Sequence, residues 1–440
     1  MKISARLSVV ATMAISGLAL TLAGTAPASA APASGHATAA DGTRLWLARF
    51  GGSSVAADMV ESPSGSAVFI TGWSGREGTF GPTDEGTTLA YNTATGARLW
   101  ADHYFPGPRS HVQFTQLAVS PDGSRVFTVS SDFELSGSSG ETFLTVAYSA
   151  ATGAQLWADK TTLKGFLNSV TVSPDGKSVY VTGVGHAGVA TVAYDAATGA
   201  QLWAQDSGVG NGVAVAASPD GSAVYVTGTS TSGTPATVAY SAATGNVLWT
   251  TRAAIPPAAL KVSRDGSTVY VTGGFNGPNG TEAYNAATGA VRWTKPDSQT
   301  PGAIAVSPDG STVFIADIGQ QGTTSVARVI AYAAATGIPR WIHRISVFQP
   351  ALAVSPDGAT LFLAGEAVEP DSDHPSLYGT AALDTGTGAQ LWIARYRSAF
   401  TASADAVAVT PDGSRVVVTG TTQSPEPGSV PTIVTLAYSS

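Results

Sequence analysis

The amino-acid sequence predicts an all-β fold, an eight-bladed β-propeller of four-stranded blades. Three observations carry this prediction: a turn signature that occurs eight times, a second repeat that ends in tryptophan and also occurs eight times, and an incomplete copy of that repeat at each end of the repeat region. Repeats of about 40 to 50 residues are typical of propeller blades, which bury their faces only by stacking on one another.

The first signature is the turn SPDG. Its serine stands at positions 120, 173, 218, 307 and 355, with the variants SPSG at Ser62, SRDG at Ser263 and TPDG at Thr410. Proline presets φ for the second position of a type I turn, and glycine adopts the left-handed conformation that closes a bulged hairpin. Alternating or β-branched residues flank the turn, as in AIAV at 303–306 and STVFIA at 311–316. We therefore expect SPDG to join the innermost strand, A, to strand B.

The second signature ends in tryptophan at positions 46, 100, 157, 203, 249, 293, 341 and 392, each with a glycine four residues earlier. In TVAYDAATGAQLW, residues 191–203, a strand runs into a polar turn at Gly199 and resumes at QLW. The turn is expected to join strands C and D. The tryptophan should pack at the wide outer edge of the blade, because a residue that recurs in phase with the fold belongs to its packing.

The two ends of the repeat region complete each other. Residues 40–46 read ADGTRLW, and nothing resembling TVAYD precedes them, while the chain ends in TLAYSS. Joined, the ends give TLAYSSADGTRLW, which aligns without a gap with TVAYSAATGAQLW at 145–157. We expect the N-terminal segment to be the outer strand of the last blade, closing the ring and removing the strand edges that an open ring would expose.

Residues 1–30 have the pattern of a secretory signal peptide. Lys2 and Arg6 precede an apolar run from Leu7 to about Gly24, and small residues lead to a cleavage motif that ends at Ala30. A membrane anchor is the alternative, since about 18 apolar residues nearly span a bilayer. Small residues interrupt the run, however, and the cleavage motif follows directly. We expect a linker at 31–39, a single propeller domain at 40–440, and a secreted, extracellular monomer without a membrane anchor.

Composition removes several classes of function. The chain has no cysteine, which excludes disulfides, thiol nucleophiles and thiolate metal sites. Without residues 1–30, 20 basic and 30 acidic residues remain, a formal charge of −10, so nucleic acid is not expected as a partner. The six histidines have no metal-like spacing, and no GxSxG elbow occurs. We therefore predict no metal site.

The repeat A-Y-D-x-A-T-G-x-x-L-W resembles that of the quinoprotein alcohol dehydrogenase-like propellers, and VSPDGSxVYVTG resembles YVTN-type and WD-type repeats. Together these resemblances cover residues 40–440 and imply a propeller. The quinoprotein resemblance implies a pyrroloquinoline quinone on the axis beside a calcium ion. This chain lacks the adjacent cysteines of many such dehydrogenases, and no acidic or asparagine residues fall on the positions of the calcium ligands. We therefore predict no cofactor.

Function is expected on one face of the ring. The A–B and C–D turns lie on one face and are uniform, whereas the B–C and D–A connections lie on the other face and vary. The units ending at Trp392, Trp46, Trp100 and Trp157 have 51, 55, 54 and 57 residues, against 44 to 48 in the others. These four units are neighbours in the closed ring. Their long loops should therefore form a wall on one side of the variable face.

The candidate ligand-binding residues break the repeat within the long segments 72–86, 101–114 and 131–141. They are Trp73, Arg76, His103, Tyr104, Arg109, His111, Asp132 and Glu134. Aromatic rings mixed with hydrogen-bonding groups suit a protein surface or a carbohydrate. We predict a binding module that uses the variable face. The alternative is an enzyme with a site on the same face, of the lyase or lactonase type or, less expected, a quinone-dependent dehydrogenase. The sequence assigns no catalytic residue.

Overall fold

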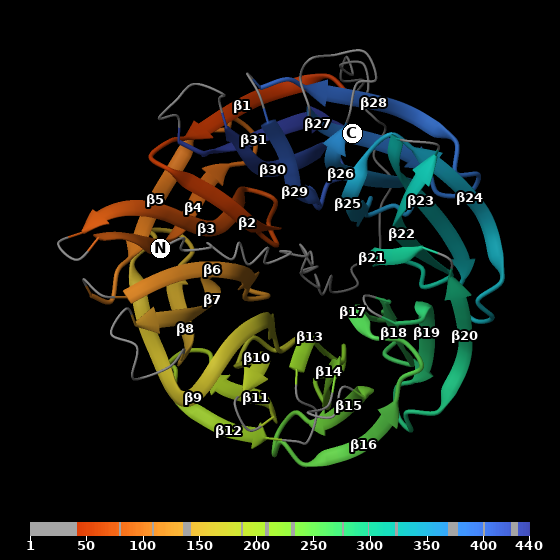
Figure 1. The fold of residues 1–440 in the computed structure, drawn as a ribbon, viewed down its shortest axis with the longest axis horizontal. Coiled ribbons are helices and arrows are strands. Elements are labelled where there is room, and N and C mark those ends of the chain that lie inside the picture. Colours follow the sequence, from red (N-terminus) through yellow and green to blue (C-terminus); the bar gives the residue numbers. More distant parts are fainter. Residues whose placement is uncertain are drawn as a thin grey trace, which may run out of the picture.

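The computed structural model describes residues 42–440 except 79–80, 108–109, 135–141, 186–187, 207–210, 230–233, 275–276, 298, 322–323, 368–376, 399–400 and 424–429. The described residues form eight four-stranded antiparallel blades in a ring, with the inner strands around the axis (Figure 1). The predicted eight-bladed propeller is confirmed. None of the described residues belongs to a helix that could cross a membrane.

The strands of the first four blades follow one another from the axis outwards. Blade 1 has β2 (Ser54–Glu61), β3 (Ala67–Gly78), β4 (Gly81–Asn92) and β5 (Arg98–Tyr104). Blade 2 has β6 (Ser110–Val119), β7 (Arg125–Glu134), β8 (Thr142–Ser149) and the first part of β9 (Gln155–Val172). Blade 3 has the rest of β9, β10 (Ser178–Gly185), β11 (Gly188–Asp195) and β12 (Gln201–Asp206). Blade 4 has β13 (Asn211–Ala217), β14 (Ala223–Thr229), β15 (Pro235–Ser241) and β16 (Val247–Arg252).

The other four blades repeat this order, and the last one draws on both ends of the chain. Blade 5 has β17 (Pro257–Val262), β18 (Thr268–Gly273), β19 (Asn279–Asn285) and β20 (Val291–Asp297). Blade 6 has β21 (Thr300–Val306), β22 (Thr312–Gln321), β23 (Thr324–Ala333) and β24 (Pro339–Ile345). Blade 7 has β25 (Phe348–Val354), β26 (Thr360–Ala367), β27 (Leu377–Asp384) and β28 (Gln390–Tyr396). Blade 8 has β29 (Thr401–Val409), β30 (Arg415–Gln423), β31 (Thr432–Ser439) and β1 (Arg44–Phe50).

The ring closes as the sequence predicts. β1 pairs antiparallel with β31, with Leu47 opposite Leu436 and Phe50 opposite Ile433. The turn beyond this ladder is also bonded, because Ser439 N donates to Thr43 O at 2.9 Å. The N-terminal strand is therefore the outer strand of blade 8, so that this blade has four strands like the others.

The SPDG turns adopt the predicted bulged geometry. In the turn at 173–176, Gly176 has φ of 72° and its N–H donates to Ser173 O at 2.9 Å. The Ser173 hydroxyl donates to Asp175 Oδ1 at 2.6 Å and accepts from Ser178 N at 2.9 Å. The serine and aspartate of the motif thus satisfy each other and the turn backbone, which accounts for their repetition.

Each outer-strand tryptophan locks onto the following blade. Trp203 on β12 is 7% exposed, and its Nε1–H donates to Ala242 O of blade 4 at 2.9 Å. Its ring covers Gly245, which has φ of 71° and at which a Cβ would lie only 2.8 Å from the indole. The same donation to a carbonyl of the next blade, at 2.8–3.1 Å, is made by Trp46, Trp100, Trp157, Trp249, Trp293 and Trp341.

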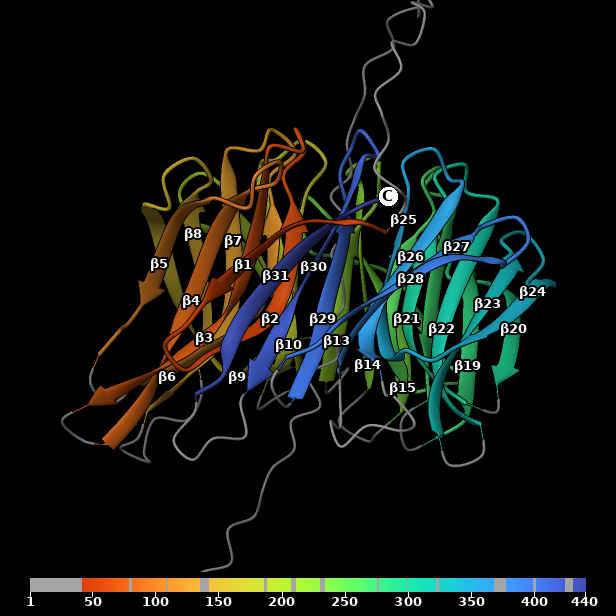
Figure 2. The same ribbon diagram turned by 90° about the horizontal axis from the view of Figure 1, so that it is seen from above.

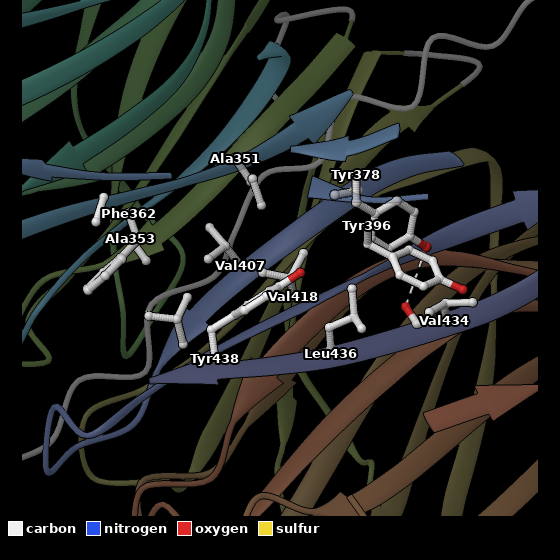
Figure 3. Close-up of a cluster of buried hydrophobic side chains, with 14 of the residues drawn as sticks. Ala351, Ala353, Phe362, Tyr378, Tyr396, Val407, Val418, Val434, Leu436 and Tyr438 are labelled. Carbon is white, nitrogen blue, oxygen red and sulfur yellow. Dashed lines mark hydrogen bonds between the residues drawn. The ribbon is translucent and has the colours of Figure 1, made fainter. Parts of the chain in front are cut away.

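Eight clusters of buried apolar side chains, one at each blade interface, make up the core of the described residues. Figure 3 shows the cluster between blades 7 and 8, where Phe362 and Tyr378 face Val418 and Leu436. The Tyr378 hydroxyl donates to Val434 O at 3.4 Å. The buried apolar area is thus divided among interfaces between blades, so stability depends on neighbouring blades remaining in contact.

Removal of residues 31–46 is expected to unfold the ring or make it aggregate. The deletion removes the first three residues of β1, among them Trp46 with its contact to blade 1, and exposes the part of β31 opposite them to pairing with other chains. Thermal unfolding and size-exclusion chromatography measure the effect, and deletion of 31–39 alone is the control that should behave like the protein starting at residue 31. An unchanged melting temperature after the longer deletion would show that β1 is dispensable.

Substitution Trp203→Ala is expected to cost roughly 3 to 5 kcal/mol of unfolding free energy, the usual cost of removing a large buried aromatic side chain. Leu202→Ala is the matched control, because Leu202 is the adjacent residue and 51% exposed, and its cost should stay within about 0.5 kcal/mol. Chemical denaturation measures both values. Equal effects of the two substitutions would contradict the interlocking role of the tryptophan.

Candidate functional site

The longest run of the predicted loop wall, 72–86, is mostly strand, so the prediction is wrong in its secondary structure there, whereas 135–141 lie outside the described residues. β3 and β4 have 12 residues each, against six in β18 and seven in β19, and they pair continuously from Ala67 opposite Asn92 to Gly78 opposite Gly81. A two-stranded ladder satisfies backbone groups that a loop would leave to water, although the glycine-rich sequence hides the alternation of a strand. Figure 2 shows these strands and β6 reaching the edge of the molecule.

The predicted residues are accordingly carried by strands. Trp73 lies on β3, His103 and Tyr104 on β5, His111 on β6 and Asp132 on β7. Arg76 and Glu134 lie on β3 and β7, but their side chains are outside the described residues, as is the whole of Arg109.

Tyr104, His111 and Asp132 come together between blades 1 and 2. The Tyr104 ring lies 6.1 Å from that of Phe114 on β6. His111 Nδ1 lies 3.2 Å from Asp84 N and 3.6 Å from Asp84 Oδ2. Gln113 Nε2 donates to the same carboxylate oxygen at 2.7 Å. Side chains of β4, β5 and β6 thus form a polar and aromatic patch at one interface.

Asp132 is the buried anion of this patch. It is 2% exposed, and one carboxylate oxygen accepts a hydrogen bond from Lys160 Nζ. Its other oxygen, Oδ1, has no hydrogen-bond partner among the described residues. Burial and then the charge of Asp132 raise the pKa of Tyr104, so the phenol remains a neutral hydrogen-bond donor.

Trp73 belongs to the same side of blade 1. It stands opposite Gly86 in the ladder, and opposite residues of an antiparallel pair project from the same face of the sheet. A Cβ on Gly86 would lie 2.4 Å from the Phe114 ring, so this face is directed towards blade 2. Trp73 is half-buried and therefore keeps part of its surface available for contact.

His103 lies on the opposite side of blade 1. Its Nδ1 lies 3.0 Å from Glu85 Oε1 and 3.2 Å from the Thr87 hydroxyl, and its ring is 5.8 Å from Phe50 of blade 8. The hydroxyls of Thr87, Ser74 and Ser54 continue this chain at 2.8 and 2.7 Å. The predicted set is therefore divided between two interfaces, since adjacent residues of a strand point to opposite faces.

Sequence reasoning missed the polar partners Asp84, Glu85, Gln113 and Lys160. One signal could have found Lys160, because a basic residue stands three positions after the repeat tryptophan in six of the eight blades. These residues are Arg49, His103, Lys160, Arg252, Arg344 and Arg395. The acidic partners have no such periodicity, and only the pairing of the strands identifies them.

The inner strands do not fit a calcium-bound quinone. No group of three or more His, Asp or Glu side chains in the described part of the chain is placed to hold a metal ion. Asp58, on the inner strand of blade 1, has its carboxylate occupied by Met59 N at 2.8 Å and Leu117 N at 3.2 Å. That second bond serves the backbone of β6 next to a register shift between Phe114 and Gln116. The carboxylate thus has a structural role in joining blades 1 and 2.

A cavity of about 360 Å³ lies instead on the uniform face, between the SPDG turns of blades 7 and 8. Its lining includes Asp357, Asp412 and Ser440. Both aspartates already accept the hydroxyl and N–H groups of their own turns, Ser355 and Ala359 for the first and Thr410 and Ser414 for the second. These carboxylates therefore belong to the turn motif.

The arrangement defines a class: a closed eight-bladed propeller whose blades interlock through a tryptophan and a left-handed glycine. The family model described as "Outer membrane protein assembly factor BamB" matches residues 143–274, 188–308 and 279–428, well over half of the chain. The chain belongs to this family of PQQ-like repeat proteins. None of the curated proteins matches it.

Solved structures share the fold at low sequence identity. BamB from Moraxella catarrhalis is 14% identical with a TM-score of 0.52, covering 90% of this chain and 97% of that one. Quinohemoprotein alcohol dehydrogenase ADHIIG from Pseudomonas putida HK5 is 14% identical with a TM-score of 0.57, covering 90% and 76%. Chaetomium thermophilum Sqt1, bound to the N-terminus of the ribosomal protein L10, is 14% identical with a TM-score of 0.62, covering 90% and 100%.

Substitution Asp405→Asn is expected to reduce the pH dependence of stability. Burial raises the pKa of this carboxyl on the inner strand β29 from 3.8 to about 7. The unfolded chain loses its proton first, so this group makes the folded state less stable as the pH rises from 3.8 to about 7. The variant should therefore gain in melting temperature relative to the natural protein between about pH 4.5 and about pH 8.

Asp175→Asn is the opposite control for this measurement. Its pKa is lowered by the hydrogen bond from Ser173, so its contribution to stability is present above the unfolded pKa and is lost in acid. The variant should therefore fall behind the natural protein as the pH rises. A difference between Asp405→Asn and the natural protein that stays constant with pH would contradict the prediction.

Proposed function

We propose that this chain is an exported binding module that holds a protein partner against blades 1 and 2. The observation that carries the proposal is the gathering of Trp73, Tyr104, His111 and Asp132 at one blade interface, in a part of the ring that departs from the repeat. Propellers present binding groups on a rigid frame, and half-buried aromatic residues beside charged groups are typical of protein contact sites.

The local chemistry supports a partner with both apolar and cationic or hydroxyl-bearing side chains. Trp73 and Tyr104 offer flat apolar area at a low cost in side-chain entropy. Asp84, whose side chain is 28% exposed, offers a carboxylate to the partner, whereas the buried Asp132 holds Lys160 at the edge of the patch. The matched family is named for an assembly factor, and the Sqt1 structure contains a bound protein segment, which supports the choice of a protein partner.

The binding test uses the protein starting at Ala31. Export is tested separately, by sequencing the N-terminus of the exported protein, which should be Ala31. For the binding test, the protein is screened against an array of secreted proteins and against a glycan array, and the affinity of each hit is measured. Trp73→Ala and Tyr104→Ala are each expected to weaken a protein hit by at least about tenfold, the effect of losing a contact worth more than about 1.4 kcal/mol.

Lys177→Ala on the uniform face is the control, since Lys177 is 81% exposed and lies far from the proposed site in the SPDG turn of blade 3. It should leave the affinity unchanged, and all variants must keep the melting temperature of the natural protein. Retention of full binding by both aromatic variants would refute the proposed site. A glycan hit that depends on Tyr104 would keep the site but replace the class of partner.

A further inference from the structure

The outer strands of blades 4 to 6 differ in charge from the rest of the ring. Residues 247–345, from β16 to β24, contain eight Lys or Arg and five Asp or Glu, a formal charge of +3, whereas the remainder of 31–440 carries −13. On the three outer strands themselves the only carboxylate is Asp297, and it is bound by Arg328. This side of the rim is therefore cationic on an otherwise acidic protein.

β24 combines this charge with exposed apolar surface. Arg340, Ile342 and Arg344 are exposed, while the alternating residues Trp341 and His343 are half-buried and Ile345 is buried. Ile342 is 54% exposed, and Ile338 just before the strand is 59% exposed. Burial lowers the pKa of His343, so at neutral pH this ring adds no charge. The exposed face of the strand therefore carries two cations, Arg340 and Arg344, with the aliphatic Ile342 between them.

The edge of β24 is open to another strand. Blade 6 is ordered β21-β22-β23-β24, so the outer edge of β24 has no strand partner among the described residues. An open edge offers a row of backbone N–H and C=O groups, which is the basis of recognition by strand addition. Arg340 is held in place by its hydrogen bond to the Thr312 hydroxyl at 2.7 Å, whereas Arg344 forms no ion pair within the described part of the chain.

Two other roles for the exposed arginines of β24 are protection against aggregation and binding to a membrane. Both explain these residues less well than strand addition does. Charged residues on edge strands can prevent aggregation, but Leu99, Leu156 and Leu202 occupy the position of Arg340 in other blades and are about half exposed. A membrane surface would need a flat patch. Neighbouring blades of an eightfold ring are turned by about 45°, so β16, β20 and β24 face different directions (Figure 1). A partner would therefore contact one of these strands at a time.

We propose that the outer edge of β24 binds an extended acidic segment of a partner protein as a fifth strand of blade 6. Acidic side chains of the segment would lie beside Arg340 and Arg344, and an apolar side chain between them would cover Ile342. This surface is independent of the proposed function, since blade 6 stands opposite blade 2 in the ring (Figure 1).

The probe is a fluorescein-labelled peptide SETVTES, whose two glutamates and valine lie on one face of an extended strand, titrated into the protein starting at Ala31 and followed by fluorescence anisotropy. We expect saturable binding that is lost for the peptide SKTVTKS. The double substitution Arg340→Glu with Arg344→Glu should weaken binding by at least about tenfold. Arg395→Glu is the matched control, because Arg395 is an exposed arginine three positions after the tryptophan on β28 of the next blade, and it should change the affinity by less than about threefold.

Three results would overturn the proposal. The first is no saturable binding of SETVTES, and the second is an equal loss of affinity in Arg395→Glu, which would reveal only a response to net charge. The third is unchanged binding of SETPTES, whose proline removes both the apolar side chain and its backbone N–H. In the first case, binding of phosphatidylglycerol vesicles in an Arg344-dependent manner would replace the strand by a membrane. Tyr104→Ala should leave peptide binding unchanged, which separates this test from that of the proposed function.

Discussion

The ring depends on one contact repeated around it, the packing of each outer-strand tryptophan on the left-handed glycine of the next blade. The contact joins three requirements at one place. Glycine is needed for φ near 70°, a side chain there would collide with the indole, and the indole N–H satisfies a carbonyl of the same turn. The N-terminal segment takes part twice, since Trp46 on β1 covers Gly96, and Gly42, just before β1, lies under Trp392. One short segment therefore completes the chain of contacts on both sides of the closing blade.

This contact also explains why the fold could be predicted from the sequence. The glycine four residues before each tryptophan and the SPDG turn both determine local backbone geometry. Such geometry can be predicted from a few neighbouring residues, without knowledge of distant ones. The register shift in the inner strands was not predictable in this way. In blades 1, 3 and 8 the register of the ladder skips Ala57, Asn168 and Asp405, three residues of no common type. The shift is a β-bulge with one extra residue on the inner strand, and no shared residue type marks its position in the sequence.

In the candidate site, too, some features could be predicted from the local sequence, whereas others depend on the register of the strands. Breaks in the repeat identified Trp73, Tyr104, His111 and Asp132, and the structure places these four on the interface between blades 1 and 2. His103 was chosen by the same reasoning and lies on the other side of β5, because its neighbour Tyr104 takes the face towards blade 2. Whether a residue faces one interface or the other depends on where its strand begins to pair, and 72–86 gave no sign of pairing at all. The partners Asp84 and Lys160 depend on that register as well.

The interlock determines how the two proposed surfaces can relate to each other. Between blades 2 and 6 lie three further blades on either side, and every interface among the described residues has a packed apolar cluster and an inserted tryptophan. Packed interfaces of this kind resist gradual deformation, so a ligand at one side changes the other only if it alters a whole interface. The patch between blades 1 and 2 and the outer edge of β24 should therefore bind independently. A rigid ring with two independent surfaces of different charge suits a protein that holds two partners at a fixed separation, and this role requires neither movement of the blades nor a group on the axis.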